Sequence, residues 1–280
     1  MTVPTRTPPD QPTAMPPLDG AAPTPPRRPG RKVVVGAGVL FALVSVGYGC
    51  LVLVNLLGQR TYHSTRHFPI THELVLDGGD ENVTIVPDAT DQVVVQQTVL
   101  RGIQHTHGSD HVDATGALHL GVKCPPWVPT TCNIHTTVHV PVDLDVRGSL
   151  GDGDLHATGL TGSFHLSAGD GSIELVRHVG DVWLHSGDGS VRLTELRARQ
   201  VAVSTGDGSV SIDLAEPPDS VVLRSGDGSV NLAVPDDGTA YAVTTSTGDG
   251  SVHDDLANDP RASRHIDVHT GDGSVHLSYG

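Results

Sequence analysis

Glutamate and lysine, two of the residues that most favour α-helices, are scarce in this sequence. Only five of its 32 acidic residues are Glu, and only two of its 17 basic residues are Lys (Lys32 and Lys123). Gly and Pro, in contrast, number 33 and 20 among 280 residues. This composition excludes a helical bundle and predicts a fold made of strands and turns.

Aromatic residues and positive charge are scarce as well. The chain holds 3 Phe, 2 Trp and 4 Tyr, and its formal net charge is −15. Proteins that bind DNA or RNA hold phosphates with basic side chains and stack bases on aromatic rings. We therefore expect no nucleic-acid partner.

Cysteine is limited to three residues, of which Cys50 lies in an apolar segment. The other two, Cys124 and Cys132, are separated by seven residues that include three Pro. A metal or redox site is the alternative interpretation, but two Cys at this spacing match neither a C-x-x-C motif nor a tetrahedral ligand set. We predict a structural disulfide that closes a stiff loop, as in a protein exposed to an oxidising compartment.

One long apolar segment runs from Val33 to Leu57, 25 residues without a carboxylate or a base. Its length suits a helix that crosses a hydrocarbon core about 30 Å thick, so we predict one transmembrane helix. Four bases lie within residues 27–32 and fewer follow the segment, which by the positive-inside rule places the N-terminus in the cytoplasm and the C-terminal domain outside the cell. A cleaved signal peptide, the alternative, would have a shorter apolar core.

The first 32 residues hold ten Pro and no apolar periodicity, a composition typical of disordered segments. Matches to P-x-x-P in this tail, such as Pro23 to Pro26, are expected by chance in so Pro-rich a segment. We divide the chain into a disordered cytoplasmic tail, a transmembrane helix, a linker, an irregular N-terminal β region with the disulfide loop, and a repeat region, over residues 1–32, 33–57, 58–67, 68–145 and 146–280.

The tripeptide Gly-Asp-Gly occurs seven times in the C-terminal half, at intervals of 18 to 23 residues. Apolar residues alternate with polar ones on both sides of each copy, as in VAVSTGDGSVSI, which indicates two short strands joined by a fixed turn. An antiparallel β-meander remains an alternative, because Asp-Gly between alternating runs is also a hairpin signal. Since the same turn recurs once per repeat while the other connection varies, we predict an all-β fold, a single-stranded parallel β-solenoid.

Alternation also predicts which side chains of the repeats face the core. The inward set is Phe164, Leu166, Ile173, Leu175, Val182, Leu184, Val191, Leu193, Val201, Val203, Val210, Ile212, Val221, Leu223, Val230, Leu232, Val243, Val252, Ile266, Val268, Val275 and Leu277. The sixth copy departs from the pattern at its second inward position after the turn. That position holds Asp254, followed by Asp255, where the other complete copies have Leu or Ile. We expect that coil to be distorted.

Residues from about 68 to 280 resemble the bacterial putative-adhesin domain family, whose function is not settled. The resemblance rests on the repeated GDGSV turns, on the strand Val138–Pro141 that leads through Leu144–Val146 into the first turn, and on Leu74–Ile85, which looks like a degenerate earlier turn. Members of this family carry such turns along a β-solenoid, often behind one membrane anchor. The resemblance implies a role in binding at the cell surface.

The seven turn aspartates are expected to form a column along the solenoid, where neighbouring carboxylates repel one another. A row of Ca²⁺ ions is one way to offset this repulsion. The interpretation we adopt is structural: each carboxylate accepts hydrogen bonds from its own turn. The column comprises Asp152, Asp170, Asp188, Asp207, Asp227, Asp249 and Asp272.

Histidine is frequent, with 17 residues, and suggests a transition-metal site as a further hypothesis. The candidate ligands are His105, His107, His111, His135 and His139. No H-E-x-x-H motif or Cys-His set accompanies them, so we predict no metal and no cofactor. His253 and His276 occupy equivalent outward positions of successive copies and are expected on the surface.

Motifs of nucleophilic or nucleotide chemistry are missing, so we predict no catalytic residue and no enzymatic activity. The sequence favours a non-catalytic, adhesin-like binding or scaffold module whose ligand is a protein or polysaccharide at the cell surface. Two alternatives are a hydrolase or lyase acting on polysaccharide at the lateral face of the solenoid, and the sensor ectodomain of an envelope signalling system. The chain also ends soon after its last copy, which predicts an open final strand and end-to-end self-association.

Overall fold

The computed structural model describes residues 31–58, 60–89, 92–101, 107–123 and 133–280. The predicted disulfide partners Cys124 and Cys132 and the candidate ligand His105 lie outside the described residues, as does the Pro-rich tail up to residue 30. The chain divides into two compact units, Met1–Gly49 and Cys50–Gly280, and the second unit holds all of the strands.

The apolar segment forms one helix, α1, over Arg31–Leu57. Its described side chains are mostly exposed, among them Phe41 and Leu57. Within the described residues, no helix meets the length and apolarity needed to cross a membrane. The helix is therefore confirmed, and its role as a membrane span stays a prediction.

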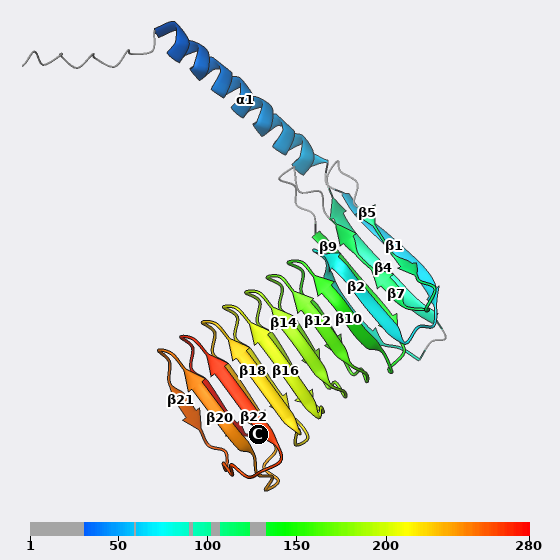
Figure 1. The fold of residues 1–280 in the computed structure, drawn as a ribbon. Coiled ribbons are helices and arrows are strands. Elements are labelled where there is room, and N and C mark those ends of the chain that lie inside the picture. The colour runs from blue at the N-terminus through cyan, green and yellow to red at the C-terminus, as the bar shows by residue number, and fades with distance from the viewer. Residues whose placement is uncertain (1–30, 59, 90–91, 102–106, 124–132) are drawn as a thin grey trace, which may run out of the picture. The chain divides into compact units, whose positions relative to one another are not determined.

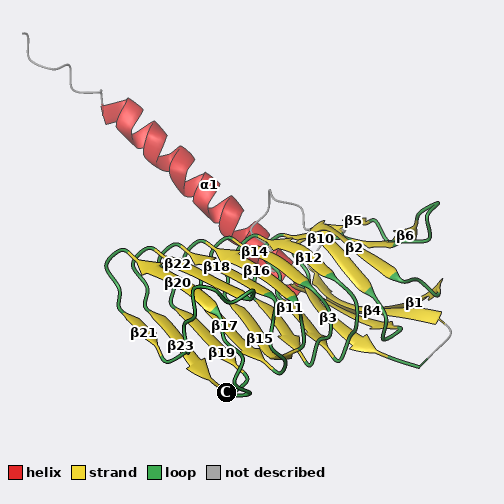
Figure 2. Ribbon diagram, turned by 60° about the horizontal axis from the view of Figure 1, so that its bottom comes forward, coloured by secondary structure: helices red, strands yellow, loops and turns green. Residues whose placement is uncertain are grey.

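The second unit is built from two large sheets that lie as two layers, with one small two-stranded sheet beside them (Figures 1 and 2). In spatial order, the first sheet contains β1 (Arg60–Pro69), β4 (Gln92–Arg101), β9 (Asn133–Val140), β3 (Asn82–Pro87), β11 (Leu155–Thr158), β13 (Ile173–Val176), β15 (Val191–Leu196), β17 (Val210–Leu214), β19 (Val230–Val234), β23 (Val275–Tyr279) and β21 (Val252–Asp254). The second sheet contains β20 (Ala242–Thr247), β22 (His265–Thr270), β18 (Ser220–Ser225), β16 (Gln200–Thr205), β14 (Val182–Ser186), β12 (Phe164–Ala168), β10 (Asp145–Leu150), β2 (Glu73–Gly79), β7 (Leu118–Leu120) and β6 (His111–Val112). The small sheet pairs β5 (His107–Gly108) with β8 (Val122–Lys123).

Each Gly-Asp-Gly copy contributes one strand to each large sheet, so one copy is one coil of a solenoid-like body. Strands of successive coils pair in parallel and in register, as between β12, β14, β16 and β18. This parallel pairing confirms the predicted architecture and shows that the meander alternative is wrong. The degenerate turn joins the same stack, because β2 pairs in parallel with β10 and β3 with β11.

Antiparallel pairing is found at the N-terminal end of the first sheet. There β4 pairs with β9, and β1 pairs with β4 along its full length. The predicted linker over residues 58–67 is wrong in this respect, because most of that range lies in β1. Its side chains are mostly polar and exposed, as is common in a strand at the edge of a sheet.

The turns show why the motif has its particular residues. A Cβ atom built on Gly208 would lie 2.1 Å from the carbonyl oxygen of Gly189 in the previous coil, so the second Gly of the motif cannot carry a side chain. Where a Ser or Thr precedes the motif, its hydroxyl donates a hydrogen bond to the carbonyl of the second Gly in the neighbouring coil. The buried Thr205 hydroxyl, for example, donates to the Gly189 carbonyl at 3.1 Å. Equivalent bonds join Ser186 to Gly171, Ser225 to Gly208, Thr270 to Gly228 and Thr247 to Gly273.

The core lies between the two sheets and follows the predicted inward set, with two exceptions. Val252 is 43% exposed and Val243 is only partly buried, and both lie in the sixth coil, β20 and β21. All other members of the set are buried. Alternation therefore located the core correctly, and the exceptions are explained by the position of the sixth coil.

The last two coils are exchanged in space relative to their order in the chain. The seventh coil, β22 and β23, lies between the fifth coil, β18 and β19, and the sixth coil. Its strands pair with a neighbour on both sides, because β20 and β21 pair with its outer edges. The predicted open edge at the final strand is therefore wrong, and the exposed edge belongs to β20 and β21.

This exchange gives a reason for the aberrant acidic residues. Asp254 and Asp255 lie at the exposed end of the solenoid, where a charged edge strand opposes pairing with another chain. The carboxylate of Asp254 also accepts the backbone N–H of Leu256 at 3.0 Å. The sixth coil is thus a terminal coil rather than a distorted internal one.

Candidate functional site

The seven turn aspartates lie on successive turns, as expected of a column. All seven residues are exposed, while the backbone N–H of Gly187 bonds the carbonyl of Gly169 in the coil before, and later coils repeat this contact. Within the described part of the chain, none of these carboxylates accepts a hydrogen bond. The hydrogen bonds expected within each turn are therefore not found among the described residues.

Among the candidate histidine ligands, His111 and His139 have described contacts with other side chains. His111 stacks on His119 with ring centroids 4.8 Å apart, and His139 lies 3.7 Å from a carboxylate oxygen of Asp88. His253 and His276 stack at 5.0 Å on the outer face of the first sheet, as surface residues. No group of three or more metal-ligating side chains occurs in the described residues.

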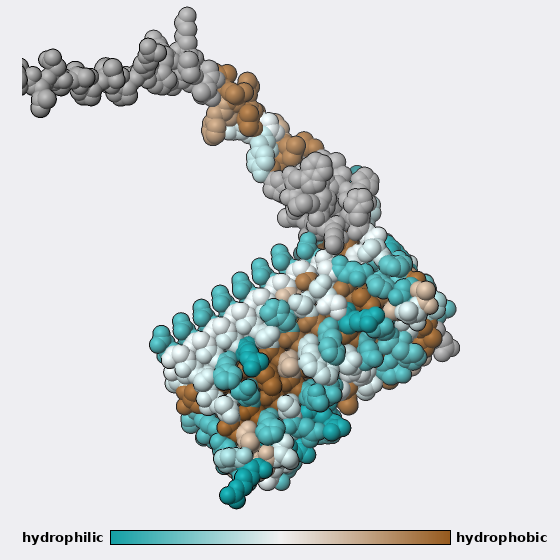
Figure 3. Space-filling view, viewed as in Figure 1, coloured by the Kyte–Doolittle hydropathy of each residue, from teal (hydrophilic) through white to brown (hydrophobic). Residues whose placement is uncertain are grey.

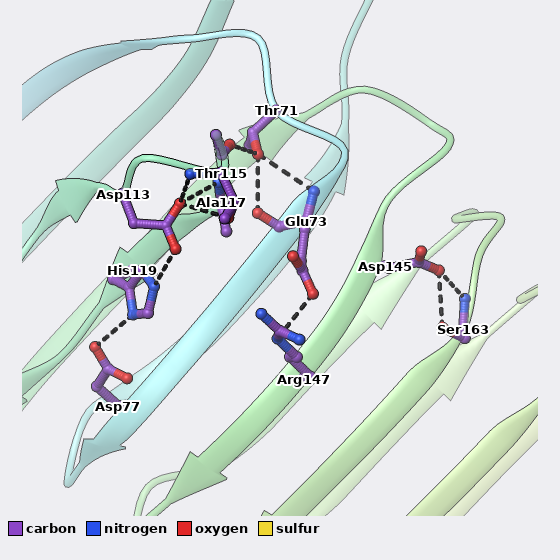
Figure 4. Close-up of polar contacts among 11 residues, drawn as sticks. Thr71, Glu73, Asp77, Asp113, Thr115, Ala117, His119, Asp145, Arg147 and Ser163 are labelled. Carbon is purple, nitrogen blue, oxygen red and sulfur yellow. Dashed lines mark hydrogen bonds and ion pairs between the residues drawn. The ribbon is translucent and has the colours of Figure 1, made fainter.

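At the N-terminal end of the second sheet, the polar side chains on the outer face pair with one another (Figure 4). The His119 ring lies between two carboxylates, 3.1 Å from Asp77 and 3.3 Å from Asp113. Hydrogen bonds from Thr115 hold the pKa of Asp113 well below its usual range. The Arg147 guanidinium pairs with Glu73 at 2.7 Å. These groups already have partners, so this end offers few free charges to a ligand.

Further along the same face, five coils form a shallow groove with a volume of about 410 Å³. It begins at Gly148 of β10 and crosses β12, β14, β16 and β18, on the side of the molecule that Figure 3 shows, where apolar surface is bordered by hydrophilic side chains. The groove is lined by Gly148, His165, Leu166, Ser167, Trp183, Leu184, His185, Ala202, Val203, Ser204, Val222 and Arg224. We call this surface the Trp183 groove.

Two rows of outward residues build the Trp183 groove. In the first row, His165, Trp183, Ala202 and Val222 lie in register on neighbouring strands. The rings of His165 and Trp183 stack with centroids 4.0 Å apart and an angle of 15° between their planes. Because His165 covers one face of the indole, the opposite face is turned towards the small side chain of Ala202.

The second row supplies the polar border. His185 bonds the Ser204 hydroxyl at 2.9 Å, and Arg224 follows on the next strand in register with Ser204. The Arg224 side chain is 60% exposed and lies 3.8 Å from Asp267, a loose contact that leaves its guanidinium accessible. Among the described residues that line the groove, none is a carboxylate. A pair of carboxylates, which glycoside hydrolysis requires, is therefore not part of this lining.

The ionisable side chains of Glu81 and His178 are buried away from the groove. Burial raises the pKa of Glu81 to about 7, although the Thr136 hydroxyl donates a hydrogen bond to its carboxylate. Burial lowers the pKa of His178 to about 4, and its ring packs edge-on against Phe164 at 4.7 Å. These groups affect stability rather than ligand contact.

The repeat region was compared with known protein families. Residues 145–278 match the family described as Toastrack DUF4097. The Toastrack match begins at β10 and ends within β23, so it spans all seven Gly-Asp-Gly coils. It supports the resemblance to the putative-adhesin domain family. The comparison with curated proteins finds no match.

Solved structures are similar to this chain at low sequence identity, and one of them reaches a TM-score above 0.5. A putative adhesin from Bacteroides fragilis has a TM-score of 0.52 and 14% identity, over 78% of this chain and 97% of that one. A putative adhesin from Parabacteroides merdae matches at a TM-score of 0.45 and 10% identity, over 78% and 96% of the two chains. A putative cell adhesion protein from Clostridium sporogenes gives 0.35 and 10%, over 79% and 100%.

Sequence reasoning did not find the Trp183 groove. Its residues are ordinary outward positions of different repeats, and their proximity depends on the strand register between coils. One signal was present in the strand that precedes each Gly-Asp-Gly turn. The outward position between its two inward apolar residues holds a large ring at His165 and Trp183 and a small side chain at Ala202. Aligning the copies by this position would have marked the gap.

Proposed function

We propose that the chain is a non-catalytic binding module of the bacterial cell envelope that holds its ligand in the Trp183 groove. The observation that carries this proposal is the groove itself: an apolar floor and an indole face, bordered by hydroxyl, imidazole and guanidinium groups. Ligand sites typically combine a concave apolar surface with a few polar groups. The rigid parallel coils beneath it hold these side chains at fixed spacing.

We further propose that α1 anchors the module in the membrane, with its N-terminus in the cytoplasm and the strands outside the cell. The argument rests on the uncharged apolar run 33–57 and on the excess of bases in residues 27–32. A disulfide between Cys124 and Cys132 would fit an oxidising exterior. An anchored module with an outward groove is suited to attachment.

The binding proposal is tested with the full-length chain in mild detergent and isolated envelope fragments of the producing bacterium. We expect the protein to sediment with the fragments, and Ala202→Trp, which fills the groove, to lower the bound fraction at least about fivefold. Ser211→Trp adds the same side chain to β17 of the same coil, on the outer face of the first sheet, and serves as the matched control.

Equal binding by wild type and both variants would contradict the placement of the ligand in the groove. An absence of binding by the wild-type protein would contradict the proposed function.

A further inference from the structure

The Trp183 groove contains an interrupted ladder of rings. His165 and Trp183 are stacked on neighbouring strands, and the next position in register, Ala202, ends after one carbon. Parallel strands are about 4.8 Å apart, so the space above Ala202 is one step of the ladder wide. A flat ring placed there lies against the free face of the indole.

We infer that the ligand is an acidic polysaccharide, bound with one uronic-acid pyranose ring above Ala202, stacked on Trp183, and with its carboxylate at Arg224. This inference rests on the proposed function and names the ligand class for the same groove. A sugar ring has an apolar C–H face and a polar rim, which match the two rows of the groove. Its C–H face packs on the indole and its other face lies towards Val222, while its hydroxyls face Ser204 and His185.

Charge selects the acidic class of sugar. The described lining offers one guanidinium and two imidazoles and no carboxylate, in a chain whose net charge is −15. Arg224 is accessible, and its planar guanidinium can bind a carboxylate with two parallel hydrogen bonds. The nearest competing anion is Asp267 at 3.8 Å, beyond the length of a good hydrogen bond.

The neighbouring surface favours a chain of sugars over a single one. The groove runs across five coils, and Ser167 and His185 continue its polar border past the stacked rings. One pyranose fills only the step above Ala202. Further units of an oligosaccharide therefore contact the border on either side.

The test measures binding of tetragalacturonate to the full-length chain by the change in indole fluorescence. The second tryptophan, Trp127, is first replaced by Phe so that Trp183 is the only reporter. We expect saturable binding that is at least about tenfold stronger than binding of galacturonic acid and of the neutral maltotetraose. Isothermal titration repeats the measurement for variants that lack the indole.

Three variants separate the contributions of the groove. Trp183→Ala and Ala202→Trp are each expected to weaken tetragalacturonate binding at least about tenfold, the first by removing the stacking face and the second by filling the ring position. Arg224→Gln is expected to remove the preference for the acidic ligand over maltotetraose. Ser211→Trp on the opposite sheet is expected to bind as the wild type does.

Each contrary result has a definite meaning. Undiminished binding by Ala202→Trp would overturn the ring position, and stronger binding of maltotetraose than of tetragalacturonate would overturn the acidic class. Failure of every saccharide, with envelope binding retained and still blocked by Ala202→Trp, would overturn the polysaccharide inference alone. The proposed function falls if envelope binding itself fails, or if Ala202→Trp leaves that binding unchanged.

Discussion

At the scale of single residues, two buried groups make the stability depend on pH in opposite directions. Glu81 has a pKa of about 7 in the folded chain against 4.5 in the unfolded one, so its contribution is greatest below pH 4.5 and is lost as the pH rises through 7. His178 has a folded pKa of about 4 against 6.5, so its contribution is present above pH 6.5 and is lost as the pH falls through 4. Between about pH 4.5 and 6.5 the two slopes oppose each other.

Replacing Glu81 by Gln is expected to remove one of these slopes. The free energy of unfolding of Glu81→Gln should exceed that of the wild type by an amount that grows between pH 4.5 and 7 and reaches on the order of 3 kcal/mol at pH 8. The reason is that the buried carboxylate must ionise at high pH and the amide need not. Urea unfolding at several pH values measures the difference.

The control for this measurement is Glu216→Gln, because the Glu216 carboxylate is 60% exposed. This variant should match the wild type within about 0.5 kcal/mol at each pH. A difference between Glu81→Gln and wild type that stays constant from pH 4.5 to 8 would show that Glu81 does not titrate in this range.

His178 also shows how a repeat accommodates an exception. The residue lies in the same column as Leu160 and Leu196 of the neighbouring coils, since Val179 bonds the carbonyl of Leu160 and Arg197 bonds that of His178. All three side chains are buried. An imidazole can therefore replace a leucine in this column only in its neutral form.

At the scale of elements, the second Gly of each motif is a position that tolerates little change. A side chain at Gly208 would meet the carbonyl oxygen of Gly189 at 2.1 Å, and backbone on both sides is fixed by the ladder of hydrogen bonds. Gly208→Ala is therefore expected to lower the free energy of unfolding by more than about 3 kcal/mol. Thermal and urea unfolding of the full-length chain measure this loss.

Ser209→Ala provides the comparison, because Ser209 is the exposed residue that follows Gly208 in the same turn. We expect a change within about 0.5 kcal/mol for this variant. Equal, small losses for the two substitutions would mean that the coils can separate at the turn without cost.

The elements were predictable where one local signal decided them. Period-two alternation assigned the buried faces, and the constant Gly-Asp-Gly turn indicated stacked coils. The role of the preceding Ser or Thr, such as Thr205, was not predictable, because its hydroxyl bonds a carbonyl in another coil. The Trp183 groove was missed for the same reason: it depends on contacts between copies, which a single repeat does not contain.

At the scale of the whole β unit, the order of the last two coils is the main feature that the sequence did not reveal. All copies share the Gly-Asp-Gly turn, so the turn does not decide which copies are neighbours. Asp254 and Asp255 distinguished the sixth copy, and they suit an edge strand better than an internal one. The chain uses its least apolar coil to end the stack.

This arrangement makes a prediction for amide hydrogen exchange. The amides of β22 and β23 have neighbours on both sides and should exchange at least about tenfold more slowly than those of β20 and β21. Deleting residues 261–280 removes the seventh coil and should abolish protection in β20 and β21 as well. Mass spectrometry of peptic peptides distinguishes the two coils.

The opposite order of protection, with β20 and β21 slower than β22 and β23, would contradict the exchanged topology. Protection of β20 and β21 that survives the deletion would show that the sixth coil can dock directly on the fifth.

The exchanged coils also bear on how the protein resists force and digestion. A free tail at the end of a stack would offer carboxypeptidases a fraying start and would let tension unzip the rod one layer at a time. Here β23 pairs with β19 on one side and with β21 on the other. The hydroxyl oxygen of Tyr279, in β23, also accepts a hydrogen bond from the backbone N–H of Ala257. A protease or a mechanical load must therefore open the sixth coil before it can release β23.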